Sequence, residues 1–153
     1  MPSSPTARIL VIDDEQRIRQ TVASCLEQEG HAVTTVATAE AARDAVSHEP
    51  FDLAFLDLRL GSTSGLDLMP DLLEQQPNLK VVVITAYASV ETAVEAMKEG
   101  ASDYLPKPFK PAQVRVAAER AAEQRALERK VESLEKRVPN RPDEVSLASE
   151  SPA

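Results

Sequence analysis

Tryptophan is absent from this 153-residue sequence, and aromatic residues make up only 3% of it. A core with so few aromatic side chains must be built from valine, leucine, isoleucine and alanine, which suits a sheet covered by helices. The single cysteine, Cys25, excludes an internal disulfide and is typical of a reducing cytoplasm. Because Cys25 lies in helical register with Ile18, Val22 and Leu26, we expect it to be a core residue rather than a nucleophile.

Long apolar runs are also missing. No run approaches the ~18 residues that a membrane-spanning helix needs, and residues 1–7 lack the features of a signal peptide. We therefore expect a cytoplasmic protein with no membrane partner. The net charge of −8 arises within residues 1–110, while acidic and basic residues balance in residues 111–153. Neither part is basic, so we expect no direct contact between this segment and nucleic acid.

Five short apolar runs alternate with five stretches of helical periodicity. The apolar runs predict parallel strands buried on both faces, and alternating βα units predict right-handed crossovers. The expected fold is α/β, a doubly wound five-stranded parallel sheet of the (βα)5, flavodoxin-like type. The predicted strands are 8–12, 32–36, 53–56, 80–84 and 103–105; the predicted helices are 15–29, 39–48, 65–76, 90–99 and 111–138.

Charged and polar side chains gather where these strands end. The first strand ends in Asp13 and Asp14, the third in Asp57, the fourth in Thr85, and the fifth continues into Lys107. In a doubly wound sheet, ligands bind beyond the carboxyl ends of the strands. An aspartate at one strand end is more often a turn residue or a helix cap. Convergence of all these groups at one edge favours a functional site.

Three neighbouring carboxylates repel one another, and a hard divalent cation relieves that repulsion. Mg²⁺ prefers oxygen ligands and usually takes one or two carboxylates together with phosphate oxygens and water. We therefore expect Asp14 and Asp57 to bind Mg²⁺ directly and Asp13 to act through a water molecule. The backbone carbonyl of Arg59 would be the remaining Mg²⁺ ligand that the protein supplies.

A carboxylate beside a metal ion and a lysine can accept a phosphoryl group. The two cationic groups neutralise the charge that spreads over the phosphoryl oxygens during transfer. Asp57 is the candidate acceptor, Lys107 the candidate ammonium, and Thr85 would donate a hydroxyl hydrogen bond to a phosphoryl oxygen.

Four motifs together resemble the receiver domains of two-component response regulators, which are CheY-like. They are IDD at 12–14, FLDLRL at 55–60, ITAY at 84–87 and DYLPKPF at 103–109, in the order and spacing of that family. The resemblance covers residues 7–122. One departure is Gly61, where the family often has proline; this change leaves the acidic cluster intact.

The resemblance implies a role for each matching residue. The Lys107–Pro108 peptide bond would be cis, and the chain would catalyse only its own phosphorylation and dephosphorylation. The implied roles are: phosphorylation of Asp57 by a histidine kinase, Mg²⁺ binding by Asp13, Asp14 and the Arg59 carbonyl, phosphoryl binding by Lys107, and a coupled switch pair formed by Thr85 and Tyr104.

The helical pattern after residue 111 is longer than a receiver requires. Leu127, Val131, Leu134 and Val138 are spaced as the apolar positions of a coiled coil. We therefore expect a receiver domain over 1–122, a helical, coiled-coil linker over 123–138 that forms a homodimer, and a disordered tail over 139–153.

The linker and the tail over 143–153 resemble the segment that joins receiver to ATPase in NtrC-type activators of sigma-54 RNA polymerase, in the alginate-regulator (AlgB-like) branch. We therefore expect the chain to stop before an output domain. Three alternatives stay open. They are a stand-alone receiver that acts through protein–protein contacts, an aspartate-dependent phosphatase of the haloacid-dehalogenase type, and a flavodoxin-like cofactor binder.

Overall fold

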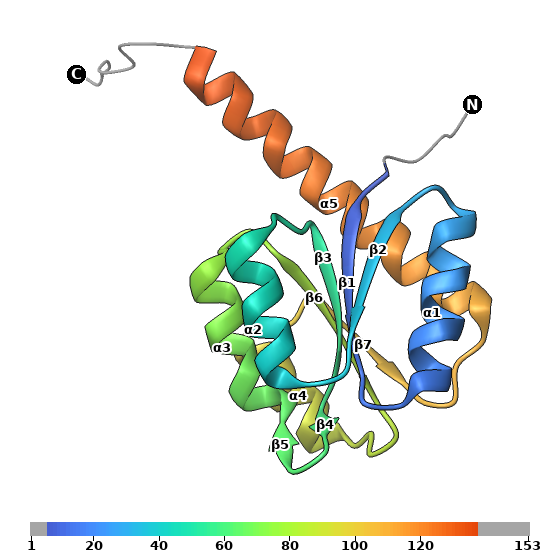
Figure 1. The fold of residues 1–153 in the computed structure, drawn as a ribbon. Helices are drawn as coiled ribbons and strands as arrows, with labels where there is room; N and C mark the ends of the chain where they lie inside the picture. The colour runs from blue at the N-terminus through green and yellow to red at the C-terminus, as the bar shows by residue number, and fades with distance from the viewer. Residues whose placement is uncertain (1–5, 138–153) are drawn as a thin grey trace.

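The computed structural model describes residues 6–137. Its central sheet has five parallel strands in the order β2, β1, β3, β6, β7, which confirms the predicted fold class (Figure 1). Within residues 6–137, no helix is both long and apolar enough to cross a lipid bilayer. The strands are β1 (Arg8–Ile12), β2 (Ala32–Val36), β3 (Leu53–Asp57), β6 (Lys80–Thr85) and β7 (Asp103–Pro106).

Helices cover both faces of the sheet (Figure 1). α1 and α5 pack on one face, while α2, α3 and α4 pack on the other. Successive side chains of β1 alternate between the two cores, since Ile9 and Val11 lie in the first and Leu10 and Ile12 in the second. The helices are α1 (Gln16–Gln28), α2 (Ala39–His48), α3 (Gly65–Gln75), α4 (Val90–Lys98) and α5 (Pro111–Arg137).

Short polar side chains begin three of these helices. Thr38 and Ser64 each accept a hydrogen bond from a backbone N–H in the first turn of α2 and α3. Ser89 and Thr92 form a reciprocal capping box at the start of α4. Gly65 brings α3 close to the end of β3, because a Cβ there would collide with the backbone of Asp57 and Leu58.

The structure adds one element to the predicted ones and shifts several boundaries by one residue. A small antiparallel hairpin, β4 (Arg59–Leu60) with β5 (Thr63–Ser64), follows β3. Two-residue strands have too little periodicity to be predicted. α1 is one residue shorter at each end than expected, and α3 and α4 each end one residue earlier. β3, β6 and β7 each extend one residue further. α5 reaches Arg137 as a continuous helix; Val138 and the tail 139–153 lie outside the described residues.

Candidate functional site

The predicted site residues converge at the carboxyl edge of the sheet. Asp13 and Asp14 follow β1, Asp57 is the last residue of β3, Thr85 is the last residue of β6, and Lys107 follows β7. β1 and β6 both pair with β3, so the groups after β1 and at the end of β6 flank Asp57. The topology of the sheet therefore creates the site from residues that are far apart in the sequence.

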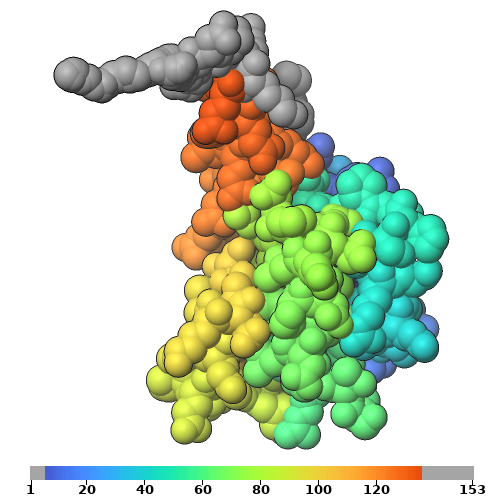
Figure 2. Space-filling view, turned by 90° about the vertical axis from the view of Figure 1, so that its left-hand side faces the viewer, coloured from blue at the N-terminus to red at the C-terminus, as the bar shows by residue number. Residues whose placement is uncertain are grey.

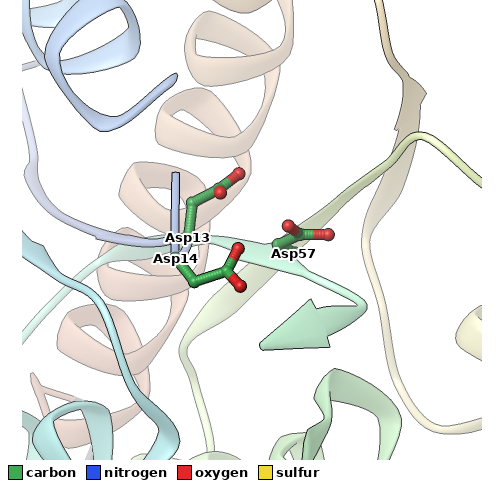
Figure 3. A group of neighbouring side chains, drawn as sticks. All are labelled: Asp13, Asp14 and Asp57. Atoms are coloured by element: carbon green, nitrogen blue, oxygen red, sulfur yellow. The ribbon is translucent and has the colours of Figure 1, made fainter. Parts of the chain in front are cut away.

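The three aspartates form a compact acidic cluster. Asp13, Asp14 and Asp57 each offer a carboxylate oxygen within 4.8 Å of the others. Figure 3 shows the three side chains directed toward a shared space, two from the end of β1 and one from β3. Asp13 and Asp57 are buried, whereas Asp14 is exposed. The cluster is therefore open on one side, where a ligand from solution can approach.

Backbone N–H groups hold these carboxylates in place. Asp13 Oδ1 accepts a hydrogen bond from Glu15 N at 2.9 Å, and Asp57 Oδ1 accepts one from Arg59 N at 3.1 Å. Asp14 Oδ2 accepts one from Gly61 N at 3.0 Å. Gly61 has φ +62°, a left-handed conformation that glycine adopts without strain. The hairpin thus connects Asp14 with the acceptor strand.

The ammonium group of Lys107 lies among the acids. Its Nζ is 2.9 Å from Asp13 Oδ2, 3.2 Å from Asp57 Oδ2 and 3.2 Å from Glu15 Oε1. The Lys107–Pro108 peptide bond is cis, as the resemblance implied. The contact with Glu15 was not predicted, although the acidic run Asp13–Glu15 was the available signal. Lys107 therefore offers a buried positive charge directly beside Asp57.

This environment changes the protonation of both partners. Burial and the Asp13 charge raise the pKa of Asp57 to about 6, although the Arg59 N–H and Lys107 act in the opposite direction. Burial alone lowers the pKa of Lys107, but the carboxylates of Asp13 and Asp57 outweigh it and raise that pKa above its ordinary value. Lys107 is consequently a permanent cation, while Asp57 is a carboxylate that is costly to ionise.

The donor set fits a hard divalent cation such as Mg²⁺. All the side-chain donors are carboxylate oxygens, and they already lie close together. The buried Asp13 Oδ2 lies 2.9 Å from the Lys107 ammonium, so the acids share a single nearby cation within residues 6–137. Three clustered carboxylates carry more negative charge than one ammonium neutralises, and a divalent metal ion would offset the remainder.

The two predicted switch residues lie on neighbouring strands. Thr85 is fully buried, and its Oγ1 accepts a hydrogen bond from Tyr87 N at 3.0 Å. Tyr104 lies on β7, opposite Val83 of β6, and its hydroxyl is 2.6 Å from Thr92 Oγ1 on α4. Thr92 was not predicted, because a threonine in a first helical turn is ordinary. Tyr104 is therefore tied to the beginning of α4.

Arg59 and Tyr87 face each other beside the site. The Arg59 guanidinium carbon lies 3.9 Å from the centroid of the Tyr87 ring, which is a cation–π contact. Arg59 follows Asp57 by two residues, and Tyr87 follows Thr85 by two. The stacked pair thus joins the two loops that lead away from the acceptor and from the buried hydroxyl.

Comparison with known proteins agrees with this geometry. The chain is 45% identical over 151 residues to the alginate biosynthesis transcriptional regulatory protein AlgB of Pseudomonas aeruginosa, which covers 99% of this chain and 33% of that protein. The chain thus spans about a third of the length of this relative.

The chain is also similar to solved structures. NtrX from Brucella abortus has a TM-score of 0.81 at 41% identity, covering 90% of this chain and 32% of that one. A response regulator protein from Burkholderia pseudomallei, with a phosphorylated aspartic acid, a calcium ion and citrate, has a TM-score of 0.70 at 37% identity, covering 82% and 74%. Residues 9–119 match the response regulator receiver domain. The chain therefore belongs to the response regulator receiver domain family.

Proposed function

We propose that Asp57 accepts a phosphoryl group from a histidine kinase and that this modification switches the state of an output domain. The observation that carries the proposal is the position of Asp57, a buried carboxylate between the Lys107 ammonium and two further acids. The similar Burkholderia pseudomallei structure, with its phosphorylated aspartic acid and calcium ion, supports this assignment.

Each residue of the site has a defined part in this proposal. Asp57 supplies the oxygen that bonds to phosphorus while the phosphorus–nitrogen bond of the phosphohistidine breaks. Lys107 neutralises charge on the phosphoryl oxygens, and Thr85 donates a hydroxyl hydrogen bond to one of them.

Mg²⁺ would be held by Asp13, Asp14, Asp57 and the Arg59 backbone carbonyl. When bound, it would offset the negative charge of the acids and of the phosphoryl group. No chemistry is proposed beyond phosphorylation and dephosphorylation of the chain itself.

The output is proposed to be transcription control through a sigma-54 activator ATPase. AlgB is named a transcriptional regulatory protein, and the match covers 33% of its length. In this proposal the long α5 forms a homodimer, and the segment itself touches neither nucleic acid nor membrane. A stand-alone receiver that acts through protein contacts is the alternative.

The phosphatase and cofactor alternatives have less support. A phosphatase of the haloacid-dehalogenase type needs a second acid two residues after the nucleophile, where this chain has Arg59. A flavodoxin-like cofactor binder needs a phosphate-cradling loop after β1, where this chain has the acids Asp13, Asp14 and Glu15.

Acetyl phosphate with Mg²⁺ provides the test. The wild type should gain one phosphoryl group, measured by mass spectrometry of the intact protein, and Asp57→Asn should gain none. The exposed acid Asp44 supplies a matched control, since Asp44→Asn should be phosphorylated like the wild type. A stable acyl phosphate on Asp57→Asn would place the acceptor elsewhere.

A further inference from the structure

Another buried carboxylate, separate from the acidic cluster, lies at the opposite end of the sheet. Asp52 immediately precedes β3, and its side chain is only 6% exposed. Three hydrogen bonds fix it, because its N donates to Arg8 O at 2.8 Å, its carbonyl accepts from Lys80 N at 3.0 Å, and its Oδ2 accepts from Arg8 N at 2.9 Å. Asp52 is therefore a rigid buried anion that the phosphorylation site does not use.

The extended part of α5 supplies the opposite charge. Arg129 donates a hydrogen bond to Asp52 Oδ1, and Arg125 Nε lies 4.0 Å from the same oxygen. The side chain of Arg125 is only 13% exposed, although this residue lies beyond the receiver boundary that the sequence predicts. A buried carboxylate is costly without a counter-charge, and here α5 provides it.

Two further contacts join the same surfaces. Lys80, at the start of β6, forms an ion pair with Glu128. Asn78 Nδ2 donates a hydrogen bond to Glu132 Oε2 at 3.2 Å. We call Asp52, Asn78 and Lys80 the basal edge. Arg125, Glu128, Arg129 and Glu132 are the docking stripe.

The docking stripe determines which way the rest of the helix faces. Its residues follow the spacing i, i+3, i+4, i+7, which defines one side of a helix. At 3.6 residues per turn, Leu127, Val131 and Leu134 point roughly 140° away from that side. These three residues are 62%, 47% and 50% exposed. Figure 2 shows α5 continuing beyond the body of the domain.

We propose that the basal edge is an intramolecular docking site for the docking stripe, and that this contact fixes the rotation of the α5 extension about its axis. With the contact made, the apolar residues face away from the receiver of their own chain and toward any second copy. The proposal deepens the proposed function, because it assumes that the extension is the linker that transmits the state of the receiver.

Charged groups fix the rotation of the α5 extension better than apolar groups do. An apolar contact tolerates rotation and sliding, whereas paired charges with fixed partners specify one orientation. Here the charges alternate along the stripe and match the edge, since Asp52 faces two arginines and Lys80 faces Glu128. Glu128 is paired with both Lys80 and Arg125, whose Nη1 lies 3.7 Å from Glu128 Oε1.

Hydrogen exchange tests the contact in protein dilute enough to be monomeric by sedimentation. Asp52→Asn keeps an acceptor for Arg8 N but removes the charge. We expect amides of residues 125–132 to exchange about tenfold faster, the effect of losing one charged hydrogen bond. Arg129→Gln removes the helix partner of Asp52 and leaves the residues of the sheet unchanged. Asp71→Asn, which removes an exposed ion pair with Arg43 elsewhere on the domain, should leave this exchange unchanged.

Spin labels report the orientation itself. With Cys25→Ala as background, labels at Glu40→Cys and Ser133→Cys should give a narrow distance distribution in the wild-type background. Asp52→Asn and Arg129→Gln should each broaden that distribution. Unchanged exchange and unchanged distances in both variants would overturn the docking site. Because both readings use monomers, failure of dimerisation would count against the proposed function and leave this result standing.

Discussion

Asp57 combines chemical reactivity with a cost in stability. Its pKa is about 6, compared with an ordinary value of 3.8. As pH rises, the unfolded chain releases the proton of Asp57 near pH 3.8, whereas the folded chain keeps it until about pH 6. The free energy of unfolding therefore falls between these two pH values. Above about pH 6 the folded protein contains the ionised Asp57 carboxylate, and burial disfavours that charged form.

Asp57→Asn should therefore raise the free energy of unfolding at pH 7.5 by about 1–3 kcal/mol in the absence of Mg²⁺. At pH 3.5 the gain should vanish, because the wild-type carboxyl is then protonated. Urea denaturation with EDTA at the two pH values measures this. Asp44→Asn, at an exposed position, serves as the control. A variant less stable than wild type at pH 7.5 would contradict the prediction.

Arg59 and Tyr87 should control the lifetime of the phosphorylated state. Hydrolysis of an acyl phosphate needs water in line with the bond that breaks, and this stacked pair lies beside the acceptor. An exposed cation–π contact is worth about 0.5–1 kcal/mol. Arg59→Ala or Tyr87→Ala should thus accelerate dephosphorylation by roughly two- to fivefold.

Tyr87→Phe retains the aromatic ring, and its phosphorylated state should decay at the wild-type rate. The double variant Arg59→Ala with Tyr87→Ala should decay little faster than either single variant, since each alone already removes the stack. Decay of the acyl phosphate in the purified protein gives the rates of the four variants and of the wild type. Additive effects in the double variant would mean that the two residues act separately.

Thr92 links the switch residue Tyr104 to the helix α4. The Tyr104 hydroxyl bonds to Thr92, and Thr92 belongs to the capping box of α4. We predict that phosphorylation draws Thr85 toward the phosphoryl group and turns Tyr104 inward. That turn must break the bond to Thr92, so this bond stabilises the unphosphorylated state only.

Thr92→Val should accordingly raise the affinity for beryllofluoride, by about fivefold if the bond is worth about 1 kcal/mol. Tyr104→Phe should have the same effect, and the double variant should add nothing more. Thr92→Ser keeps the hydroxyl and should behave like wild type. Calorimetric titration with beryllofluoride and Mg²⁺ gives the affinities. Unchanged affinity in both Thr92→Val and Tyr104→Phe would remove this bond from the switch.

The sequence predicts the elements that are regular and misses the contacts that depend on packing. Buried strands such as β6 are apolar on consecutive residues, so the parallel sheet and its carboxyl edge follow from the fold rules. The hairpin after β3 is too short to show periodicity. The spacing of Arg125, Glu128 and Arg129 is equally typical of a solvated helix face, and only the position of Asp52 identifies their partner.

At the scale of the whole molecule, α5 presents two opposite faces. One carries the docking stripe, and the other carries Leu127, Val131 and Leu134, which are exposed in a single chain. The extension of about two heptads would be marginal as an isolated helix, but the first half of α5 packs on the sheet and so nucleates the rest. Exposed apolar residues at coiled-coil spacing then favour pairing with the same face of a second copy.

We predict a homodimer through α5 that dissociates in the micromolar range, because the apolar stripe is only about two heptads long. Sedimentation across a dilution series measures the midpoint. Val131→Glu places a charge within the stripe and should give a monomer throughout the series. Ser133→Glu adds the same charge off the stripe and should dimerise like wild type. Equal self-association of both variants and wild type would move the interface from α5 to another face of the receiver.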